Sequence, residues 1–339
     1  MATIKEIANS LGLSSATVSR ALRNDETLSI LPETRAKIFM EAEKTGYKVK
    51  VKKENTVKKE IFITVVHKQQ TFRNQIDSAY YFSVRAGIED ACAKNRITCT
   101  FATMDDERGY LPDTQGIIIV GNYLKEDFDR ILSKCTGLPI VTVGIISYYP
   151  NVIDHVTHSN SESLQMALDY LFNNGHTKIG YLGIKEASGT SFFTSRKQKF
   201  IEILSARNCF RPEWVLESEH GRDRVEQGYI TMNEWLARGG ELPTAIFCAN
   251  DPIALGALNA LREAGIDVPS QISIIAHDGS YPTQYSVPPL STIDVHPFQM
   301  GTEALDLLLE RIHGGRTVSK KVLFFPELIE RASVRRINP

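Results

Sequence analysis

From Ile61 onward, the chain alternates short runs of β-branched residues with longer amphipathic stretches. The strand candidates are IFITVV (61–66), GIIIVG (116–121), LPIVTV (138–143), KIGYLG (178–183), TAIFC (244–248) and ISIIA (272–276). Helical periodicity lies near residues 83–95, 125–135, 161–174, 195–208, 224–238, 252–264 and 298–313. Near-continuous apolar strands separated by helices predict parallel sheets that are covered on both faces. We therefore expect two doubly wound α/β subdomains, one before and one after about residue 158.

The first 60 residues differ from this pattern in charge as well as in periodicity. They hold 12 Lys and Arg against 8 Asp and Glu, whereas the rest of the chain holds 27 against 32. A basic head on an acidic body favours a polyanionic partner for the head alone. The excess is modest, so charge by itself does not separate this interpretation from chance.

Three short helices are predicted before residue 48. The inward-facing apolar residues of the first two recur at helical spacing and are Ile4, Ile7, Ala8, Leu11, Val18, Ala21 and Leu22. Gly12 ends the first helix, because glycine readily adopts the left-handed conformation, and Ser14 can cap the second. Pro32 suits the first turn of a third helix, which Gly46 would end. Two helices joined by a tight glycine turn form a helix-turn-helix unit.

The outward face of the second predicted helix carries small and hydrogen-bonding side chains. No acidic residue lies between Glu6 and Asp25, and short side chains let a helix approach base edges in the major groove. Arg20 could contact guanine O6 and N7 with its guanidinium group, while the hydroxyl groups suit phosphates. The alternative is a three-helix packing domain whose exposed face happens to be rich in Ser and Thr.

The run TIKEIANSLGLSSATVSRAL (3–22) resembles the N-terminal signature of the LacI/GalR family of bacterial transcription regulators. The segments NNGHTKIGYLG, CANDPIALGALNALREAGIDVPSQISIIAHDG, PPLSTID and PELIERASV resemble the same family in the same order, so the resemblance covers nearly the whole chain. The DNA contacts that it implies are Ser15, Ala16 and Arg20 for bases and Ser14, Thr17 and Ser19 for phosphates.

Two features depart from the family pattern. Arg23 stands where members usually carry Asn, and the arginine could add a further phosphate contact. Residues 48–60 read KVKVKKENTVKKE, with six lysines but without the leucine that family hinge helices often wedge into the minor groove. Either Val51 or Val57 takes its place, or the protein binds without a wedge. A lysine-rich linker would in both cases be held by phosphates.

The resemblance implies a DNA-binding domain (1–47), a lysine-rich hinge (48–60) and an effector-binding and dimerisation domain (61–339). The last would have periplasmic-binding-protein architecture, with subdomain one at about 61–158 plus 291–321 and subdomain two at about 159–290 plus 322–339. The chain would then cross between the subdomains three times. The resemblance also implies a homodimer, and whether dimers pair into tetramers stays open.

Polar residues just past strand ends form the candidate effector site, since ligands of open α/β sheets bind beyond the carboxyl ends of the strands. Asn250 follows TAIFCA, Asp278 follows ISIIAH, and Arg196 lies at the start of the helix after KIGYLG. Amide, carboxylate and guanidinium groups together can bind sugar hydroxyls. Each residue has a structural alternative, as a helix cap, a turn residue and a surface ion pair respectively. The resemblance favours effector contacts for all three.

The resemblance also places Tyr80, Tyr81, His158 and Phe192 at the wall of the cleft. Aromatic faces suit the apolar side of a pyranose, and they equally suit an ordinary core. Family members often carry a charged residue after the fourth strand, where this chain has Gly144. This difference leaves the orientation of a bound sugar open.

The sequence offers no support for catalysis, a cofactor or a metal. It lacks HExxH, GxSxG and GxxxxGK[ST], and its eight histidines have no metal-ligand spacing. The five cysteines are scattered and form no CxxC pair: Cys92, Cys99, Cys135, Cys209 and Cys248. The N-terminus lacks the apolar core of a secretory signal, and no run approaches the roughly 18 apolar residues of a membrane helix. We therefore expect a cytoplasmic protein without a membrane partner.

These observations predict a homodimeric, effector-responsive transcription repressor that binds pseudo-palindromic double-stranded operator DNA. The nearest resemblance is to galactose- and lactose-operon repressors, so galactose or a galactoside is the favoured effector. One alternative keeps the architecture but has a purine, a nucleoside or a partner phosphoprotein as effector. Another is a solute-binding protein or a sugar enzyme that uses the α/β body alone.

Overall fold

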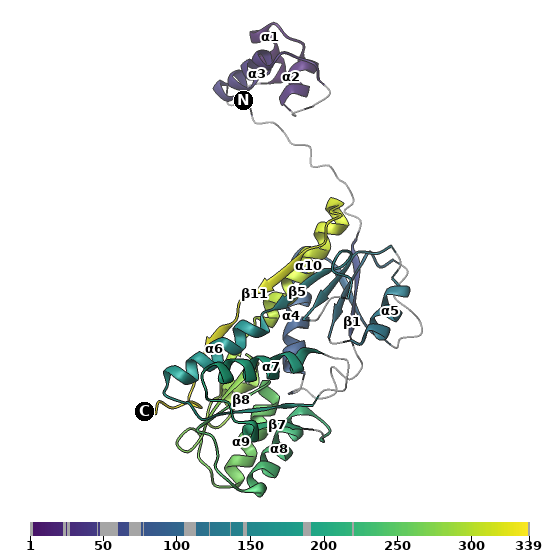
Figure 1. The fold of residues 1–339 in the computed structure, drawn as a ribbon. Helices are drawn as coiled ribbons and strands as arrows, with labels where there is room; N and C mark the ends of the chain where they lie inside the picture. Colours follow the sequence, from purple (N-terminus) through teal and green to yellow (C-terminus); the bar gives the residue numbers. More distant parts are fainter. Residues whose placement is uncertain are drawn as a thin grey trace. The chain divides into compact units, whose positions relative to one another are not determined.

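The computed structural model describes residues 3–22, 25, 28–45, 47, 60–67, 76, 78–104, 113–121, 123–135, 137–144, 148–185, 191–218 and 220–337. The chain forms two compact units, residues 1–59 and 60–339 (Figure 1). The first is helical and the second contains two sheets, so the expected fold class is confirmed. No helix within the described ranges is both long and apolar enough to cross a lipid bilayer.

The N-terminal unit consists of α1 (Ile4–Leu11), α2 (Ser15–Leu22) and α3 (Pro32–Lys44). Helix α1 begins with a capping box, in which Thr3 N donates to Glu6 Oε2 at 2.7 Å and Glu6 N donates to Thr3 Oγ1. Gly12 ends α1 with a φ of 66°, and Thr17 N donates to Ser14 Oγ at 3.0 Å, so both predicted caps are confirmed. The buried core comprises Ile7, Ala8, Val18, Ala21, Leu22, Ile38 and Ala42.

The third helix ends before the predicted glycine. Its last residue is Lys44, and Thr45 caps it, with the Thr45 hydroxyl donating to Glu41 O at 2.6 Å. A side-chain hydroxyl thus satisfies one of the terminal carbonyls of this helix, and the role of Gly46 stays a prediction. Gly46 and Arg23 lie outside the described residues, as does the predicted hinge apart from Glu60.

The first lobe of the larger unit is built on a six-stranded sheet in the order β11-β5-β4-β3-β1-β2, with every pair parallel. Its strands are β1 (Phe62–His67), β2 (Thr98–Thr103), β3 (Gly116–Val120), β4 (Ile140–Val143), β5 (Asp154–His158) and β11 (Lys321–Phe324). Helices α4 (Ala79–Asn95) and α10 (Pro297–Gly314) pack together on one face, and α5 (Lys125–Ser133) covers the other (Figure 1). The sheet core is therefore enclosed between two helical layers.

The second lobe has a sheet in the order β12-β10-β9-β8-β6-β7, and only the β10–β12 pair is antiparallel. Its strands are β6 (Ile179–Ile184), β7 (Val215–Ser218), β8 (Ala245–Cys248), β9 (Ser273–Asp278), β10 (Ser291–Asp294) and β12 (Glu327–Ile329). Its helices are α6 (Asn160–Asn173), α7 (Ser191–Ala206), α8 (Arg224–Arg238) and α9 (Asp251–Glu263). In both lobes the first strand lies inside the sheet, so the order reverses between β1 and β3 and between β6 and β8.

The six predicted strands are confirmed within two residues at each end, but two predicted subdomain boundaries are wrong. Residues 291–294 form β10 of the second sheet, so the second crossing lies between Asp294 and Pro297. Residues 321–324 form β11 of the first sheet, so the third crossing lies between Phe324 and Glu327. Both strands are short edge or near-edge elements whose partners are distant in sequence, and local patterning carries no signal of those partners.

Glycines let two pairs of helices approach at backbone distance. A Cβ atom on Gly301 of α10 would lie 2.0 Å from Val84 O of α4, and one on Gly256 of α9 would lie 1.9 Å from Val225 O of α8. A side chain at either position would require the backbones to separate. In each lobe, a glycine therefore allows one pair of helices to pack closely together.

We expect Gly301→Ala to lower the free energy of unfolding by roughly 1–3 kcal/mol or more, because the added methyl group overpacks α4 against α10. Gly314→Ala in the same helix is the matched control, since a Cβ there meets nothing within 4 Å. The control should be neutral or slightly stabilising. Urea unfolding of both variants measures the difference, and equal midpoints would contradict the packing argument.

Candidate functional site

The three predicted effector residues follow strands of the second lobe, at the carboxyl edge of its sheet. Strand β6 leads to α7, which contains Arg196, and β8 leads to Asn250, the N-cap of α9. Asp278 is the last residue of β9. Because the strand order reverses between β6 and β8, this edge is the topological switch point where such sheets bind ligands.

Arg196 is almost fully buried, with 2% of its surface exposed. Its Nε and Nη2 atoms donate to Asn160 Oδ1, each at 3.2 Å, and its Nη1 donates to Ala249 O. Burial lowers the pKa of the guanidinium group, while the Asp278 carboxylate opposes that shift. The structure therefore places Arg196 in an interior polar network and not in the surface ion pair that was its alternative.

At the first crossing, a buried histidine of one lobe lies beside a buried histidine of the other. His158 ends β5 of the first sheet and His277 lies in β9 of the second, and their ring centroids are 5.3 Å apart. His158 Nε2 lies 3.1 Å from Asn160 Oδ1, the oxygen that also accepts from Arg196. Burial, the other imidazole and Arg196 lower the pKa of His158 to about 3, so its ring is neutral at physiological pH. Burial likewise lowers the pKa of His277.

Asp278 combines an unusual backbone with a mostly buried carboxyl group, whose side chain is 16% exposed. Its φ is 118°, a conformation that residues with side chains rarely adopt and that is concentrated at functional sites. Its Oδ1 lies 2.8 Å from His277 Nδ1. Burial raises the pKa of Asp278 to about 6, and Arg196 and His158 act against that rise. The carboxyl group is thus ionised at neutral pH but close to its titration range.

Asn250 and Asp251 hold the start of α9. Asn250 Oδ1 accepts from Ile253 N at 3.0 Å, so the capping role that was its structural alternative is present. Asp251 is completely buried and accepts from Ser280 N and Thr292 Oγ1, each at 2.6 Å. Burial and the Asp278 carboxylate raise the pKa of Asp251. These bonds tie α9 to the loop after β9, which positions Asp278.

The two tyrosine candidates come from the opposite lobe, whereas Phe192 belongs to the second lobe. Tyr80 and Tyr81 lie in the first turn of α4, half-buried, with ring centroids 5.1 Å apart in an edge-to-face arrangement. Burial raises the pKa of both phenols, and both interact electrostatically with Asp278 and Arg196 of the second lobe. Phe192 lies in α7, and its side chain is outside the described part of the chain.

Sequence reasoning missed Asn160, His277 and Arg224. Asn160 follows β5, which was not predicted as a strand, so the strand-end rule had nothing to act on. His277 lies one residue before Asp278, inside a strand, where the sequence pattern predicts a residue of the core. Arg224 is the first residue of α8 and acts electrostatically on Tyr81, Arg196 and Asp278. Its position at a helix start after β7 was the available signal.

The predicted DNA contacts are on the surface of α2 or at its start. Ser14, Ser15, Ala16 and Arg20 are exposed, and Thr17 and Ser19 are partly exposed. The Ser14 and Thr17 hydroxyls lie 2.8 Å apart. Arg20 Nε contacts Asp25 Oδ2 at 2.7 Å, an exposed ion pair that a DNA partner could replace.

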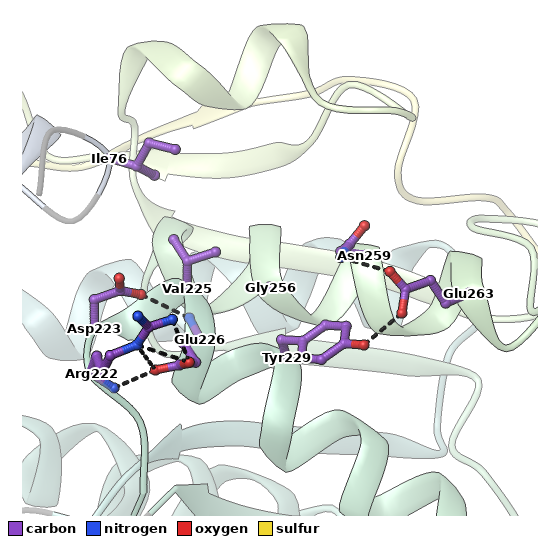
Figure 2. A pocket seen from close by; sticks show the side chains of 9 residues that line it. All are labelled: Ile76, Arg222, Asp223, Val225, Glu226, Tyr229, Gly256, Asn259 and Glu263. Carbon is purple, nitrogen blue, oxygen red and sulfur yellow. Dashed lines mark hydrogen bonds and ion pairs between the residues drawn. The ribbon is translucent and has the colours of Figure 1, made fainter.

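A separate surface pocket of about 450 Å³ lies on α8 and α9 (Figure 2). It is lined by Ile76, Arg222, Asp223, Val225, Glu226, Tyr229, Gly256, Asn259 and Glu263. Its polar groups bond to one another, with Arg222 on Glu226 and with Tyr229 and Asn259 on Glu263 (Figure 2). None of the described lining residues is an effector candidate. Over the described ranges, no group of three or more His, Cys, Asp or Glu side chains could hold a metal ion.

Residues 3–49 match the family model described as bacterial regulatory proteins, lacI family, and residues 168–334 match the periplasmic binding protein-like domain. The transcriptional regulator GanR of Bacillus subtilis (strain 168) is 31% identical over 342 residues, which cover 98% of this chain and 100% of GanR. The chain belongs to the LacI family. The resemblance drawn from the sequence motifs is thereby confirmed.

Other members of the LacI family match over the same length. The transcriptional repressor PurR of Mannheimia succiniciproducens is 29% identical over 347 residues, covering 99% of this chain and 100% of PurR. The Lac repressor dimer bound to operator and the anti-inducer ONPF has a TM-score of 0.66 at 21% identity, covering 98% of this chain and 99% of that one. This LacI-family chain is therefore a DNA-binding transcriptional regulator with an effector-binding domain.

Proposed function

We propose that the protein represses a sugar-utilisation operon, with a galactoside as the favoured effector, and that the sugar binds between the two lobes. The observation that carries the proposal is the meeting of Arg196, Asp278 and His158 at the first crossing, all with most of their surface buried. The carboxylate of Asp278 would accept from sugar hydroxyls, and the amide nitrogen of Asn250 would donate to them. Tyr80 and Tyr81 would contribute the opposing wall, and Phe192 would contribute to the wall on the side of the second lobe.

A ligand in this position would couple the lobes to the DNA-binding unit. It would contact residues of both lobes, so its affinity depends on how the lobes are arranged. An effector can shift such an equilibrium only by its different affinity for the two states. Helix α2 of each subunit of a homodimer would read one half-site of the operator through Ser14, Ser15, Ala16, Thr17, Ser19, Arg20 and Arg23.

The test measures operator binding in the presence of sugars. An operator duplex selected from a random-sequence library is labelled, and its fluorescence anisotropy is followed as galactose, lactose or melibiose is added to the full-length protein. We expect at least one sugar to change operator affinity about fivefold or more. Specific binding that no sugar alters would contradict the effector assignment and leave the DNA-binding assignment intact. Release by adenine, guanine or a nucleoside in the same assay would support the alternative effector class.

Effector affinity should depend on pH through Asp278. Burial raises its pKa to about 6, so the carboxylate that accepts from a sugar is lost progressively below that pH. We expect sugar affinity to be constant from pH 7 to 8 and to fall by up to tenfold per pH unit below about 6. His158 and His277 stay neutral in this window because their pKa values are lowered. Calorimetry of Asp278→Asn should show weaker binding with a flat pH profile.

Operator affinity should depend on Arg20. Arg20→Ala is expected to weaken operator binding by about 1–3 kcal/mol and to relax one base preference, because a bidentate contact with guanine would be lost. Arg238→Ala, an exposed arginine at the end of α8, is the control and should bind as the unmodified protein does. Anisotropy against duplexes substituted at each position measures the effect. A uniform loss on every sequence would assign Arg20 to phosphate instead.

A further inference from the structure

Tyr80 and Gly144 share one space at the carboxyl edge of the first sheet. Gly144 directly follows β4 and has a φ of 82°. A Cβ atom at this position would lie 2.9 Å from Tyr80 Oη, while the next ring atoms would be at 3.8 Å or beyond. The Tyr80 hydroxyl therefore occupies the place where a side chain at residue 144 would begin. Glycine is required here both for its backbone and for this space.

The Tyr80 hydroxyl has a weak protein partner. It donates to the Sδ atom of the buried Met300 at 3.9 Å, and a thioether is a poor acceptor. A hydroxyl group can donate one hydrogen bond and accept two. The Tyr80 hydroxyl can therefore still accept hydrogen bonds from a ligand, and it can exchange the thioether for a better acceptor. Burial raises the pKa of the phenol, so the group stays protonated and uncharged at physiological pH.

The two walls of the site differ in charge. Asp278 and Arg196 of the second lobe are charged, and both act electrostatically on Tyr80. On the first lobe, Tyr80 and Tyr81 present phenols, and Gly144 presents no side chain. A phosphate or carboxylate pressed against these described first-lobe residues would lose its hydration without gaining a cation from Tyr80, Tyr81 or Gly144. A neutral hydroxyl would lose much less.

We propose that Tyr80 is a specificity-determining residue, whose hydroxyl, held in the space that Gly144 leaves open, selects uncharged hydroxyl-bearing ligands over their phosphorylated counterparts. This inference rests on the proposed effector site and adds the substrate class for its first-lobe wall. Tyr80 would hydrogen-bond the part of the ligand that faces away from Asp278.

The first experiment removes the hydroxyl alone. Calorimetry of the full-length protein with galactose, lactose and galactose 6-phosphate should show binding of a neutral sugar and at least tenfold weaker binding of the phosphate. Tyr80→Phe should weaken binding of the neutral sugar about tenfold. Tyr229→Phe is the matched control, because its hydroxyl donates to Glu263 in the α8–α9 pocket (Figure 2) and should leave sugar affinity unchanged.

A double-mutant cycle tests the shared space. In the otherwise unmodified protein, Gly144→Ala would push the Tyr80 hydroxyl aside. We therefore expect this variant to bind the sugar more weakly than the unmodified protein does. In the Tyr80→Phe background the close contact is gone. The loss of sugar affinity caused by Gly144→Ala should therefore be at least about threefold smaller there than in the unmodified protein. The strain of alanine at a positive φ is common to both backgrounds and cancels in the cycle.

The outcomes separate this inference from the proposed function. Sugar binding that Tyr80→Phe leaves within twofold of the unmodified protein would overturn the role of Tyr80 alone, as would additive effects in the cycle. Tighter binding of galactose 6-phosphate than of galactose would overturn the selection of uncharged ligands. If no sugar binds and a nucleobase releases the operator, the proposed effector class and this inference fall together.

Discussion

Asp154→Asn should lower the free energy of unfolding of the 60–339 unit by about 3–5 kcal/mol, because it removes one partner of a buried charge cluster. The Asp154 side chain is completely buried, and Arg311 and Arg316 are mostly buried. Arg311 Nε, Arg316 Nη1 and Lys320 N donate to the carboxylate at 3.0, 3.0 and 2.7 Å. Burial alone would raise the pKa of Asp154, but these bonds outweigh it and lower the pKa. The asparagine would remove the buried counter-charge that Arg311 and Arg316 share, and Arg316 would keep only its ion pair with the more exposed Glu310.

Glu310→Gln is the matched control for Asp154→Asn. Glu310 contacts Arg316 and Lys320, but its side chain is 45% exposed. An exposed ion pair contributes about 0–1 kcal/mol, so the control should change stability little. Thermal unfolding with a urea series measures both variants. A loss below about 1 kcal/mol for Asp154→Asn, or one equal to the control's, would contradict the stability assigned to the buried charge cluster.

Arg196→Lys should abolish the response to the effector while leaving operator binding in its absence unchanged. A lysine has a single side-chain nitrogen and no planar fork, so it cannot reproduce the bonds that Nε and Nη2 of Arg196 make to Asn160 Oδ1 and Nη1 makes to Ala249 O. The link between α7 and the site around Asp278 would be lost. We expect effector affinity to fall at least about 100-fold, since each hydrogen bond of a charged group contributes roughly 1.5–3 kcal/mol. The operator should then stay bound at sugar concentrations that release it from the unmodified protein.

A control variant and two measurements distinguish a loss of effector binding from a loss of folding. Lys199→Met alters a surface lysine of the same helix, paired with Glu202, and should keep the full response. The thermal midpoint of Arg196→Lys and its sugar-free operator affinity report whether the protein is folded. A variant that folds, binds the operator and still responds within threefold of the normal sugar concentration would remove Arg196 from the effector site.

The sequence predicted those strands and helices whose own residues show the periodicity or the β-branched composition of their element. Strands such as Gly116–Val120 are buried along their whole length and are almost entirely β-branched, so the sequence alone identifies them. Strand β5 reads Asp-His-Val-Thr-His, which looks like a loop. It is buried because Arg311 and Arg316, more than 150 residues later in the chain, neutralise Asp154. No local rule contains that information.

The candidate site was predictable to a similar extent. Arg196, Asn250 and Asp278 follow strands that the pattern identified, and the rule that ligands bind past strand ends selects them. Asn160 follows β5 and was missed with it. His277 was missed because an imidazole within an apolar run reads as core. The space that Tyr80 shares with Gly144 depends on where α4 meets the end of β4, which is a tertiary fact.

The order of the strands along the chain also bears on synthesis. Strands β1–β5 are translated first, yet α10 and β11, which cover and extend their sheet, come from residues 297–324. Met300, Ala304 and Leu308 of α10 reach the apolar face only after the strands of the second lobe except β12 have been made. At roughly 5–20 residues per second, the nascent first lobe therefore presents an uncovered apolar surface for many seconds. We therefore expect the first lobe to expose its apolar surface for longer during synthesis than the second lobe does.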